Sequence, residues 1–146
     1  MHRAKACVVE CIDFRFRNYV DNFMKLQNWG DSYDLISVAG GSRDFVNPMN
    51  IHDGEYVWKE LDLSIQLHEP DFIVFIDHQD CGGYAQDGCI PANLDYVDDC
   101  KAHCEKLKEV KKNILQKYPD KTFLAYHIGL NREISTVRFD DSICCI

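Results

Sequence analysis

The sequence predicts an α/β fold: a single domain with a mostly parallel central β-sheet flanked by helices. Three observations lead to this prediction. Short, continuously apolar runs alternate with longer segments of helical periodicity, the 146 residues suit about one domain, and no linker-like or low-complexity stretch divides the chain. Continuous rather than alternating apolar residues are typical of strands buried on both faces, as in a parallel sheet. We therefore expect residues 1–146 to form one domain.

Four strands are expected, at residues 6–9, 35–39, 72–76 and 123–126. The first three of these runs end at distinctive residues, in chain order Glu10-Cys11, Gly40-Gly41 and Asp77-His78. Because parallel strands joined by right-handed crossovers all point the same way, these ends should lie at one edge of the sheet. In such sheets the functional site lies beyond the carboxyl ends of the strands.

Three helices are expected between the strands. The first follows Asn18, which we expect to be its N-cap, and Gly30 can end its last turn. The second includes the apolar positions of residues 57–65 and must stop before Pro70. The third and longest should run from about residue 93 to residue 117, with one apolar stripe and a charged opposite face.

The charge balance restricts the partners. Sixteen Lys and Arg against 24 Asp and Glu give a formal net charge of −8, and such a surface repels nucleic-acid backbones and anionic lipid. No apolar run approaches the roughly 18 residues of a membrane helix, and Glu10 and Asp13 interrupt a signal-peptide pattern. We expect a cytoplasmic protein without nucleic-acid or membrane partners, in which the eight cysteines serve metal binding or catalysis rather than disulfides.

Five residues at two strand ends form a metal-site pattern. Cys11, Asp13 and Arg15 follow the first strand, and His78 and Cys81 follow the third. Two thiolates and one imidazole are a zinc set with three protein ligands, which leaves one tetrahedral position for water. Either half alone would suit a buried cysteine or a core histidine beside a tight glycine turn. The two halves together favour the metal site.

These motifs resemble those of the β-class carbonic anhydrases, which carry Cys-x-Asp-x-Arg after the first strand and His-x-x-Cys-Gly after the third. Residues 34–40 and 126–130 extend the resemblance, which covers about residues 6 to 137. It implies a β-carbonic anhydrase-like fold and one Zn²⁺ per chain, held by Cys11, His78 and Cys81. It also implies a homodimer or higher homo-oligomer.

The resemblance further implies the activity of a carbonate dehydratase, a lyase that hydrates carbon dioxide reversibly to bicarbonate by attack of a zinc-bound hydroxide. Asp13 and Arg15 would be the catalytic dyad: Asp13 orients the hydroxide, and Arg15 holds Asp13 away from the metal by a bidentate contact. If that contact breaks, Asp13 can become the fourth zinc ligand.

The sequence departs from the family pattern in four places. Phe14 replaces a small residue between the dyad members, residues 37–41 lack the usual polar groups, and Asp77 adds negative charge next to His78. The first strand starts only about five residues into the chain, without the family's N-terminal helical arms. These departures leave two alternatives open: a hydrolase of carbonyl sulfide or carbon disulfide, and a non-catalytic zinc protein.

A third alternative, with Cys81 as a phosphatase or sulfurtransferase nucleophile, is disfavoured because Asp87 stands where an anion-binding Arg would be needed. The remaining thiols and histidines are expected to be structural or surface residues. Cys7, Cys100 and Cys104 should be small core residues and Cys89 a loop residue, while Cys144 and Cys145 lie in a tail where a vicinal disulfide would be strained. The histidines expected to be structural or surface residues are His52, His68, His103 and His127. Because His103 directly precedes Cys104 and does not face it on a helix, this spacing argues against a second metal site.

Overall fold

Five strands form one sheet in the computed structural model of the chain, which describes residues 2–139 and 145. In chain order they are β1 (Ala6–Glu10), β2 (Tyr33–Ser37), β3 (Phe72–His78), β4 (Thr122–Ile128) and β5 (Ile134–Thr136). The order across the sheet is β2-β1-β3-β4-β5, with all pairings parallel except the antiparallel pair β4–β5. The predicted α/β fold with a mostly parallel sheet is confirmed.

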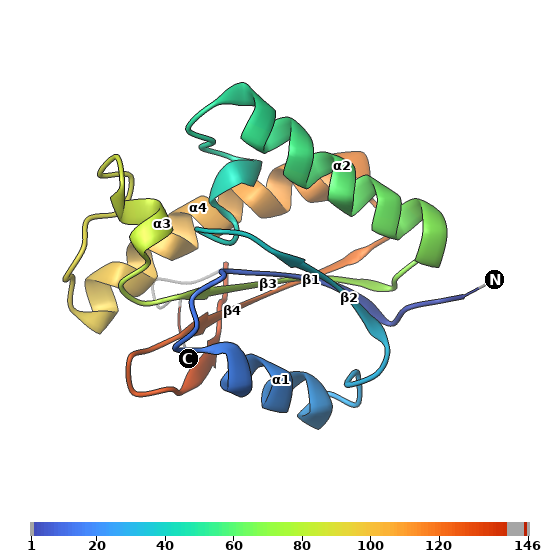
Figure 1. Cartoon of the computed structure of the whole chain (residues 1–146), viewed down its shortest axis with the longest axis horizontal. Coiled ribbons are helices and arrows are strands. Elements are labelled where there is room, and N and C mark those ends of the chain that lie inside the picture. Colours follow the sequence, from blue (N-terminus) through green and yellow to red (C-terminus); the bar gives the residue numbers. More distant parts are fainter. Residues whose placement is uncertain (1, 140–144, 146) are drawn as a thin grey trace.

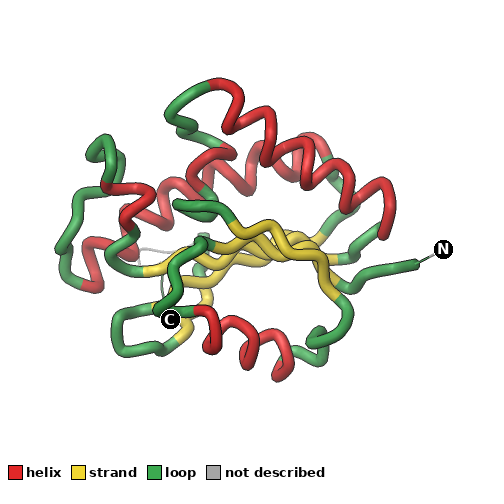
Figure 2. Tube along the Cα trace, in the orientation of Figure 1, coloured by secondary structure: helices red, strands yellow, loops and turns green. Residues whose placement is uncertain are grey.

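Helices cover both faces of this sheet (Figures 1 and 2). Helix α1 (Arg17–Leu26) lies on one face, and α2 (Ile51–His68) and α4 (Tyr96–Lys117) lie on the other. Two short pieces, η1 (Arg43–Phe45) and α3 (Gly82–Ala85), follow β2 and β3. Each face has its own apolar core. Val20 and Met24 of α1 pack against the sheet on one side, and Leu61 of α2 and Leu107 of α4 do so on the other.

The strand register determines what meets at the carboxyl edge. Glu10, the last residue of β1, pairs with Ile76 in β3 and with Ser37 in β2. Cys11 therefore leaves the sheet beside the end of β3, and the turn that follows Ser37 begins at the same edge. The amide of Val38 continues this pairing by donating to the Glu10 carbonyl at 3.1 Å. Three chain segments thus converge where the sequence predicts a site.

Helix α1 differs from its prediction at both ends. It begins at Arg17, so Asn18 lies inside it, and Phe16 occupies the N-cap position without a side-chain cap. The Phe16 side chain is buried in the α1 core instead, and this burial replaces capping. The helix ends at Leu26, before Gly30, and Asn28 adopts the left-handed conformation with φ 60°. The predicted N-cap at Asn18 and stop at Gly30 are therefore wrong.

The other elements agree with the predictions except at their limits. Helix α2 starts at Ile51 because the Asn50 side chain accepts from the amides of His52 and Asp53, and it ends before Pro70 as predicted. Strand β2 stops at Ser37, two residues before the predicted end, because the chain turns towards Gly40 at φ 87°. The short elements β5 and α3 were not predicted, since three or four residues carry too little periodicity.

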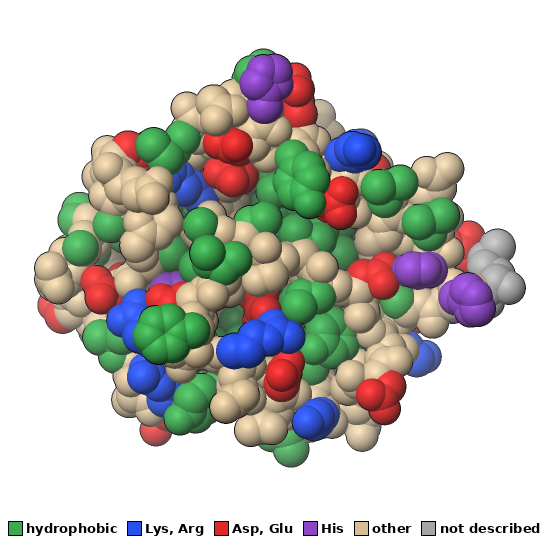
Figure 3. Space-filling model, viewed as in Figure 1, with side chains coloured by type: hydrophobic (Ala, Val, Ile, Leu, Met, Phe, Trp, Pro, Cys, Tyr) green, Lys and Arg blue, Asp and Glu red, His purple; other side chains and the backbone are tan. Residues whose placement is uncertain are grey.

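The surface carries no single dominant chemistry on the face drawn in Figure 3, where acidic, basic and apolar side chains are interspersed. Within the described part of the chain, no helix combines the length and the apolar character that crossing a membrane requires.

Candidate metal centre

The three ligands predicted from the sequence come together at the carboxyl edge of the sheet. The Cys11 and Cys81 sulfurs and one ring nitrogen of His78 all lie within 4.8 Å of one another. The two sulfurs are 3.9 Å apart. Cys11 directly follows β1, His78 is the last residue of β3, and Cys81 precedes α3. The parallel sheet thus joins residues that are about 70 positions apart in the sequence.

His78 is oriented as a metal ligand would be. Its Nδ1 lies 2.9 Å from the Gln79 carbonyl oxygen, which can only accept, so Nδ1 carries the hydrogen and Nε2 keeps the lone pair. Nε2 is buried and has no hydrogen-bond partner among the described residues. The Phe16 ring stacks on the imidazole with centroids 4.5 Å apart. Sequence reasoning missed this role of Phe16, because only the fold brings α1 under β3.

The two thiols differ in acidity. The pKa of Cys11 is lowered to about 4, chiefly because the Cys81 thiol donates to its sulfur and also because the His78 ring lies beside it. The Gly40 amide adds a hydrogen bond of 3.4 Å to the same sulfur. The contact with Cys11 and burial both raise the pKa of Cys81. A sulfur anion at Cys11 is therefore stabilised before any cation arrives, whereas ionising both thiols needs a positive charge between them.

Two glycines allow the turn after β2 to touch the start of α3, next to Cys81. A Cβ added to Gly83 would lie 2.3 Å from the Gly40 nitrogen and 2.6 Å from the Gly40 Cα. Gly40 itself has φ 87°, in the left-handed region that favours glycine. The turn after β2 thus packs backbone to backbone against the start of α3. This contact explains why glycine is needed at one position of each glycine pair, Gly40 and Gly83.

The predicted dyad is an ion pair in the structure. Arg15 Nε donates to both carboxylate oxygens of Asp13, at 3.0 and 3.1 Å, and Nη2 donates to Oδ2 at 2.6 Å. Arg15 Nη2 also donates to the Asp80 carbonyl at 3.1 Å, so the pair is fastened to the turn that carries Cys81. Asp13 Oδ2 is 3.8 Å from His78 Nε2. The hydrogen bonds from Arg15 hold the pKa of Asp13 below its usual value.

Two spaces adjoin these residues. A cavity of about 10 Å³ lies beside Cys11, Asp13 and His78. The rest of its lining is both charged and apolar: Glu10, Arg17, Phe16, Val20, Ile76 and Ile128. That volume suits about one water-sized molecule. On the outer side of Asp13 and Arg15 lies an open cleft of about 580 Å³, bounded by the side chains of Ile12 and Phe14 and by Asp80, Gly82, Ala85, Ala92 and Asn93. Phe14 is 88% exposed at the rim of this cleft.

Asp77 does not present an unpaired charge to this centre. Its carboxylate accepts from Ser42 Oγ at 2.6 Å and lies 2.9 Å from His103 Nδ1. Burial by itself raises the pKa of Asp77, but the hydrogen bonds from His103 and Ser42 outweigh burial and lower it. The carboxylate expected to add charge beside His78 is thus engaged within the core by Ser42 and by His103 of α4. Because successive residues of a strand face opposite sides of the sheet, Asp77 points away from the side that His78 faces.

The structure also bears on Cys81 as an anion-binding nucleophile. Arg43 reaches the segment after Cys81, although no arginine lies nearby in the sequence. Its guanidinium is only 2% exposed and donates to the Gly83 carbonyl, the Asn47 carbonyl and the Asp87 carboxylate. Since these donors are engaged within the protein, Arg43 is not directed at an anion. It fastens α3 to the turn after β2.

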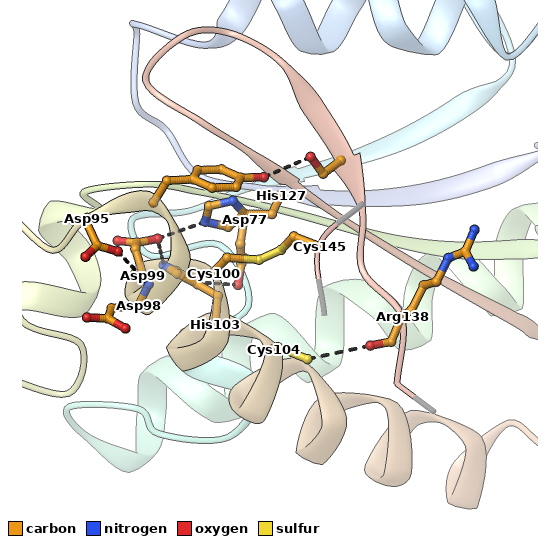
Figure 4. Close-up of a disulfide and its surroundings, with 12 residues drawn as sticks. Asp77, Asp95, Asp98, Asp99, Cys100, His103, Cys104, His127, Arg138 and Cys145 are labelled. Carbon is orange, nitrogen blue, oxygen red and sulfur yellow. Dashed lines mark hydrogen bonds and ion pairs between the residues drawn. A yellow bond between two sulfur atoms is a disulfide. The ribbon is translucent and has the colours of Figure 1, made fainter. Parts of the chain in front are cut away.

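The remaining thiols and histidines are mostly structural. Cys7 is buried in the core as a free thiol. Cys104 is buried there as well, but its sulfur is part of a disulfide, which was not expected from the sequence. His103 and His127 are buried in hydrogen-bonded contacts with carboxylates. The prediction for Cys100 was wrong, because its sulfur is joined to that of Cys145 (Figure 4). Cys145 is thus paired with α4 and not with its neighbour Cys144, which lies outside the described residues.

The comparisons with known proteins identify the family and the fold of the chain. The profile of a family described as "Putative carbonic anhydrase" matches residues 1–138. An uncharacterized protein of Rickettsia bellii (strain RML369-C) is 27% identical over 137 residues, which cover 94% of this chain and 84% of that protein.

Two solved structures show the same fold. One of two tetrameric β-carbonic anhydrases from the filamentous ascomycete Sordaria macrospora gives a TM-score of 0.59 at 10% identity, over 93% of this chain and 81% of that one. A β-carbonic anhydrase of the protozoan Trichomonas vaginalis gives 0.55 at 15% identity, over 92% of this chain and 82% of that one. At such identities the likeness concerns the fold alone.

Proposed function

This chain belongs to the putative carbonic anhydrase family, and on that premise we propose that it is a zinc-dependent carbonate dehydratase that interconverts carbon dioxide and bicarbonate. The observation that carries the proposal is the convergence of the Cys11 and Cys81 sulfurs with the unpartnered Nε2 of His78, beside an Asp13–Arg15 ion pair. Neither half of this arrangement would suffice alone.

The residues present fit zinc. Two thiolates and one imidazole are a frequent donor set for this ion, and His78 already holds the tautomer that coordination through Nε2 requires. A buried ring nitrogen without a hydrogen-bond partner lowers the stability of the fold. A cation bound to Nε2 would remove this penalty. When bound, zinc would supply the usual lowering of the pKa of water, which makes hydroxide available near neutral pH.

Asp13 would orient the water that is a substrate of the reaction. The low pKa of its carboxylate keeps it ionised, so it only accepts hydrogen bonds. Its Oδ2 faces His78 Nε2 at 3.8 Å and can hold one hydrogen of a water molecule there. Arg15 restrains this carboxylate through both of its oxygens. Without Arg15, Asp13 would be free to turn towards the metal ligands.

The other substrate would approach from the open cleft of about 580 Å³, because the small cavity has room for about one water-sized molecule. Carbon dioxide is apolar and linear, and the lining of the cleft at Asp13 and Arg15 includes the apolar side chains of Ile12, Phe14, Ala85 and Ala92. The same chemistry would accept carbonyl sulfide or carbon disulfide, which differ from carbon dioxide only by sulfur in place of oxygen. Assays on the three compounds therefore decide the substrate.

The test is carbon dioxide hydration by zinc-loaded protein, with Asp13→Asn and Arg15→Ala as variants. Each should keep zinc and lose about 10²-fold or more in kcat/KM, because the orienting group is removed while the three ligands remain. Asp71→Asn and Arg3→Ala are matched controls, since this exposed ion pair should not affect the rate. A zinc-loaded parent that hydrates none of the three substrates would establish the non-catalytic alternative. An active parent with equally active dyad variants would refute the assigned roles.

A homo-oligomer forms part of the proposal. Phe14 and Ile12 are 88% and 63% exposed beside the cleft at Asp13 and Arg15, and adjacent exposed apolar side chains are typical of interaction surfaces. The Sordaria macrospora enzymes are tetrameric. Light scattering at micromolar concentration should give at least the mass of a dimer. A monomer would refute this part of the proposal and leave the zinc site untouched.

A further inference from the structure

A second group of metal-ligating side chains lies apart from the candidate zinc centre. Cys100 in α4, His127 in β4 and Cys145 near the C-terminus each contribute one ligand atom, and these atoms all lie within 4.8 Å of one another. Figure 4 shows the His127 ring above the two joined sulfurs. Cys100 is 4% exposed and His127 is fully buried. The proposed function uses none of the three.

The His127 ring is held as a metal-binding imidazole is held. Its Nε2 lies 2.8 Å from Asp99 Oδ1. Since an ionised carboxylate only accepts, Nε2 carries the hydrogen and the lone pair lies on Nδ1. Nδ1 is buried and has no hydrogen-bond partner in the described part of the chain. A carboxylate behind one ring nitrogen and a free lone pair on the other form the usual outer support of a zinc-bound histidine.

Charge and donor type also favour a soft divalent cation. Two thiolates and one neutral imidazole carry a charge of about −2, which a divalent ion neutralises in a buried setting. Soft sulfur donors select zinc over magnesium or calcium. In a reducing compartment, such as the sequence predicts, the thiols would be available to a metal because a disulfide would not persist.

We propose that Cys100, Cys145 and Nδ1 of His127 form a second zinc site, which the reduced chain fills and which the Cys100–Cys145 disulfide closes. The two states exclude each other, because each uses both sulfurs. A dithiol or a phosphine supplies two electrons, breaks the S–S bond and is itself oxidised, and the two sulfurs become thiols. Zinc then displaces one proton from each thiol, so that two sulfur–zinc bonds form and two protons are released.

Either state ties the end of the chain to the core. Cys145 already pairs with Val137 through an isolated antiparallel bridge, and Cys100 lies in the first turns of α4. Asp99 connects this place with the first centre, since its other oxygen accepts from the Asp80 amide at 3.0 Å, next to Cys81. We therefore assign the second zinc a structural role, as a clamp on the C-terminal segment.

The experiment measures zinc per chain after loading, desalting and elemental analysis of the whole protein reduced with a phosphine. The parent should hold about two zinc ions per chain, and Cys100→Ser and Cys145→Ser should each hold about one. The matched control Cys89→Ser, which removes a half-buried loop thiol, should hold as many as the parent. Parent protein loaded without prior reduction, with its Cys100–Cys145 disulfide intact, should hold about one zinc ion, in the first site.

A second measurement covers the case in which a variant fails to fold. In the parent, cobalt(II) should give more near-ultraviolet sulfur-to-cobalt charge-transfer absorbance after reduction with the phosphine than before it, when the Cys100–Cys145 disulfide is intact. A reduced parent with one zinc per chain, or an equal cobalt signal in both redox states, would overturn the proposal. Retention of the second zinc in both Cys100→Ser and Cys145→Ser would also overturn it, because the ion would then lie elsewhere.

Discussion

Replacing Gly83 by alanine should disturb the metal centre, whereas the same change at its neighbour Gly82 should not. Both residues belong to α3 and neither has a positive φ, so backbone conformation does not distinguish them. Their surroundings do. An added Cβ would meet nothing within 4 Å at Gly82, but would lie within 2.3–2.8 Å of backbone atoms of Gly40 and Ala39 at Gly83. The pair separates a steric effect from a general effect of replacing glycine.

The size of the effect follows from these distances. Ordinary Cβ contacts begin at about 3.4 Å, so the two segments must move apart by roughly 1 Å, and overpacking of this kind costs about 1–3 kcal/mol of stability. A shift of that size exceeds the tolerance of about 0.2 Å on zinc–ligand distances, and we expect a loss of about 10-fold or more in zinc affinity. Gly82→Ala should be neutral or stabilising by up to about 1 kcal/mol.

Urea unfolding of the zinc-free proteins measures the stability, and competition with a chromophoric chelator measures the zinc affinity. Both are read as the difference between Gly83→Ala and Gly82→Ala. If the two variants agree within about 0.5 kcal/mol, the typical scatter of neutral substitutions, and bind zinc equally, the contact between the two turns does not position Cys11 and Cys81. The reasoning about the glycine pairs would then be wrong.

Three further predictions address the core, the α3 turn and the surface. Burial raises the pKa of Cys7 to about 12. The contribution of the neutral thiol to stability is therefore complete below its unfolded pKa of 9.0 and is lost as the pH rises from there towards about 12. Between pH 9 and 10 the free energy of urea unfolding should fall by up to about 1.4 kcal/mol more in the parent than in Cys7→Ala, and an equal fall in both would contradict this. Arg43→Met should cost about 1–3 kcal/mol in the same assay, because the partly buried Gly83 and Asn47 carbonyls lose their donor. Arg3→Met, at an exposed side chain, should cost at most about 0.5 kcal/mol. Equal losses would show that Arg43 does not fasten α3. Phe14→Ser should lower the mass measured by light scattering without affecting stability. Leu26→Ser, which also replaces an exposed apolar side chain, should leave the mass unchanged. An unaltered mass in Phe14→Ser would place the interface elsewhere.

The fold was predictable from the sequence because its strands are continuously apolar and end at unusual residues. The place of Cys11 beside His78 follows from parallel pairing alone, since residues that follow neighbouring strands must meet at one edge. The structure brings these ligands and the Asp13–Arg15 pair together, while their binding of zinc stays a prediction. The start of α1 was harder to predict. Phe16 occupies its N-cap position with its ring stacked on His78, and no local sequence pattern contains this contact.

The buried polar partners could not be predicted for a related reason. His103 and Asp99 are four residues apart on α4, which places them on one helix face, but their partners Asp77 and His127 come from β3 and β4. Cys100 pairs with a residue 45 positions away. Such pairings depend on how α4 crosses the sheet, and helical spacing alone favours the simpler interpretation of a cysteine in an apolar stripe.

Asp80 shows why these distant partners matter for the metal centre. It lies between His78 and Cys81 with φ 57°, a left-handed conformation that costs a residue other than glycine about 1 kcal/mol or more. Three residues from other parts of the chain hold Asp80 there. Asp99 of α4 accepts from its amide, Arg15 donates to its carbonyl, and the Asn93 amide donates to its side chain. Because each hydrogen bond fixes a different atom of the same turn, the direction of the Cys81 sulfur is determined from outside its own segment. The dyad arginine therefore has a second task, since it restrains Asp13 and at the same time braces the turn that presents the third ligand.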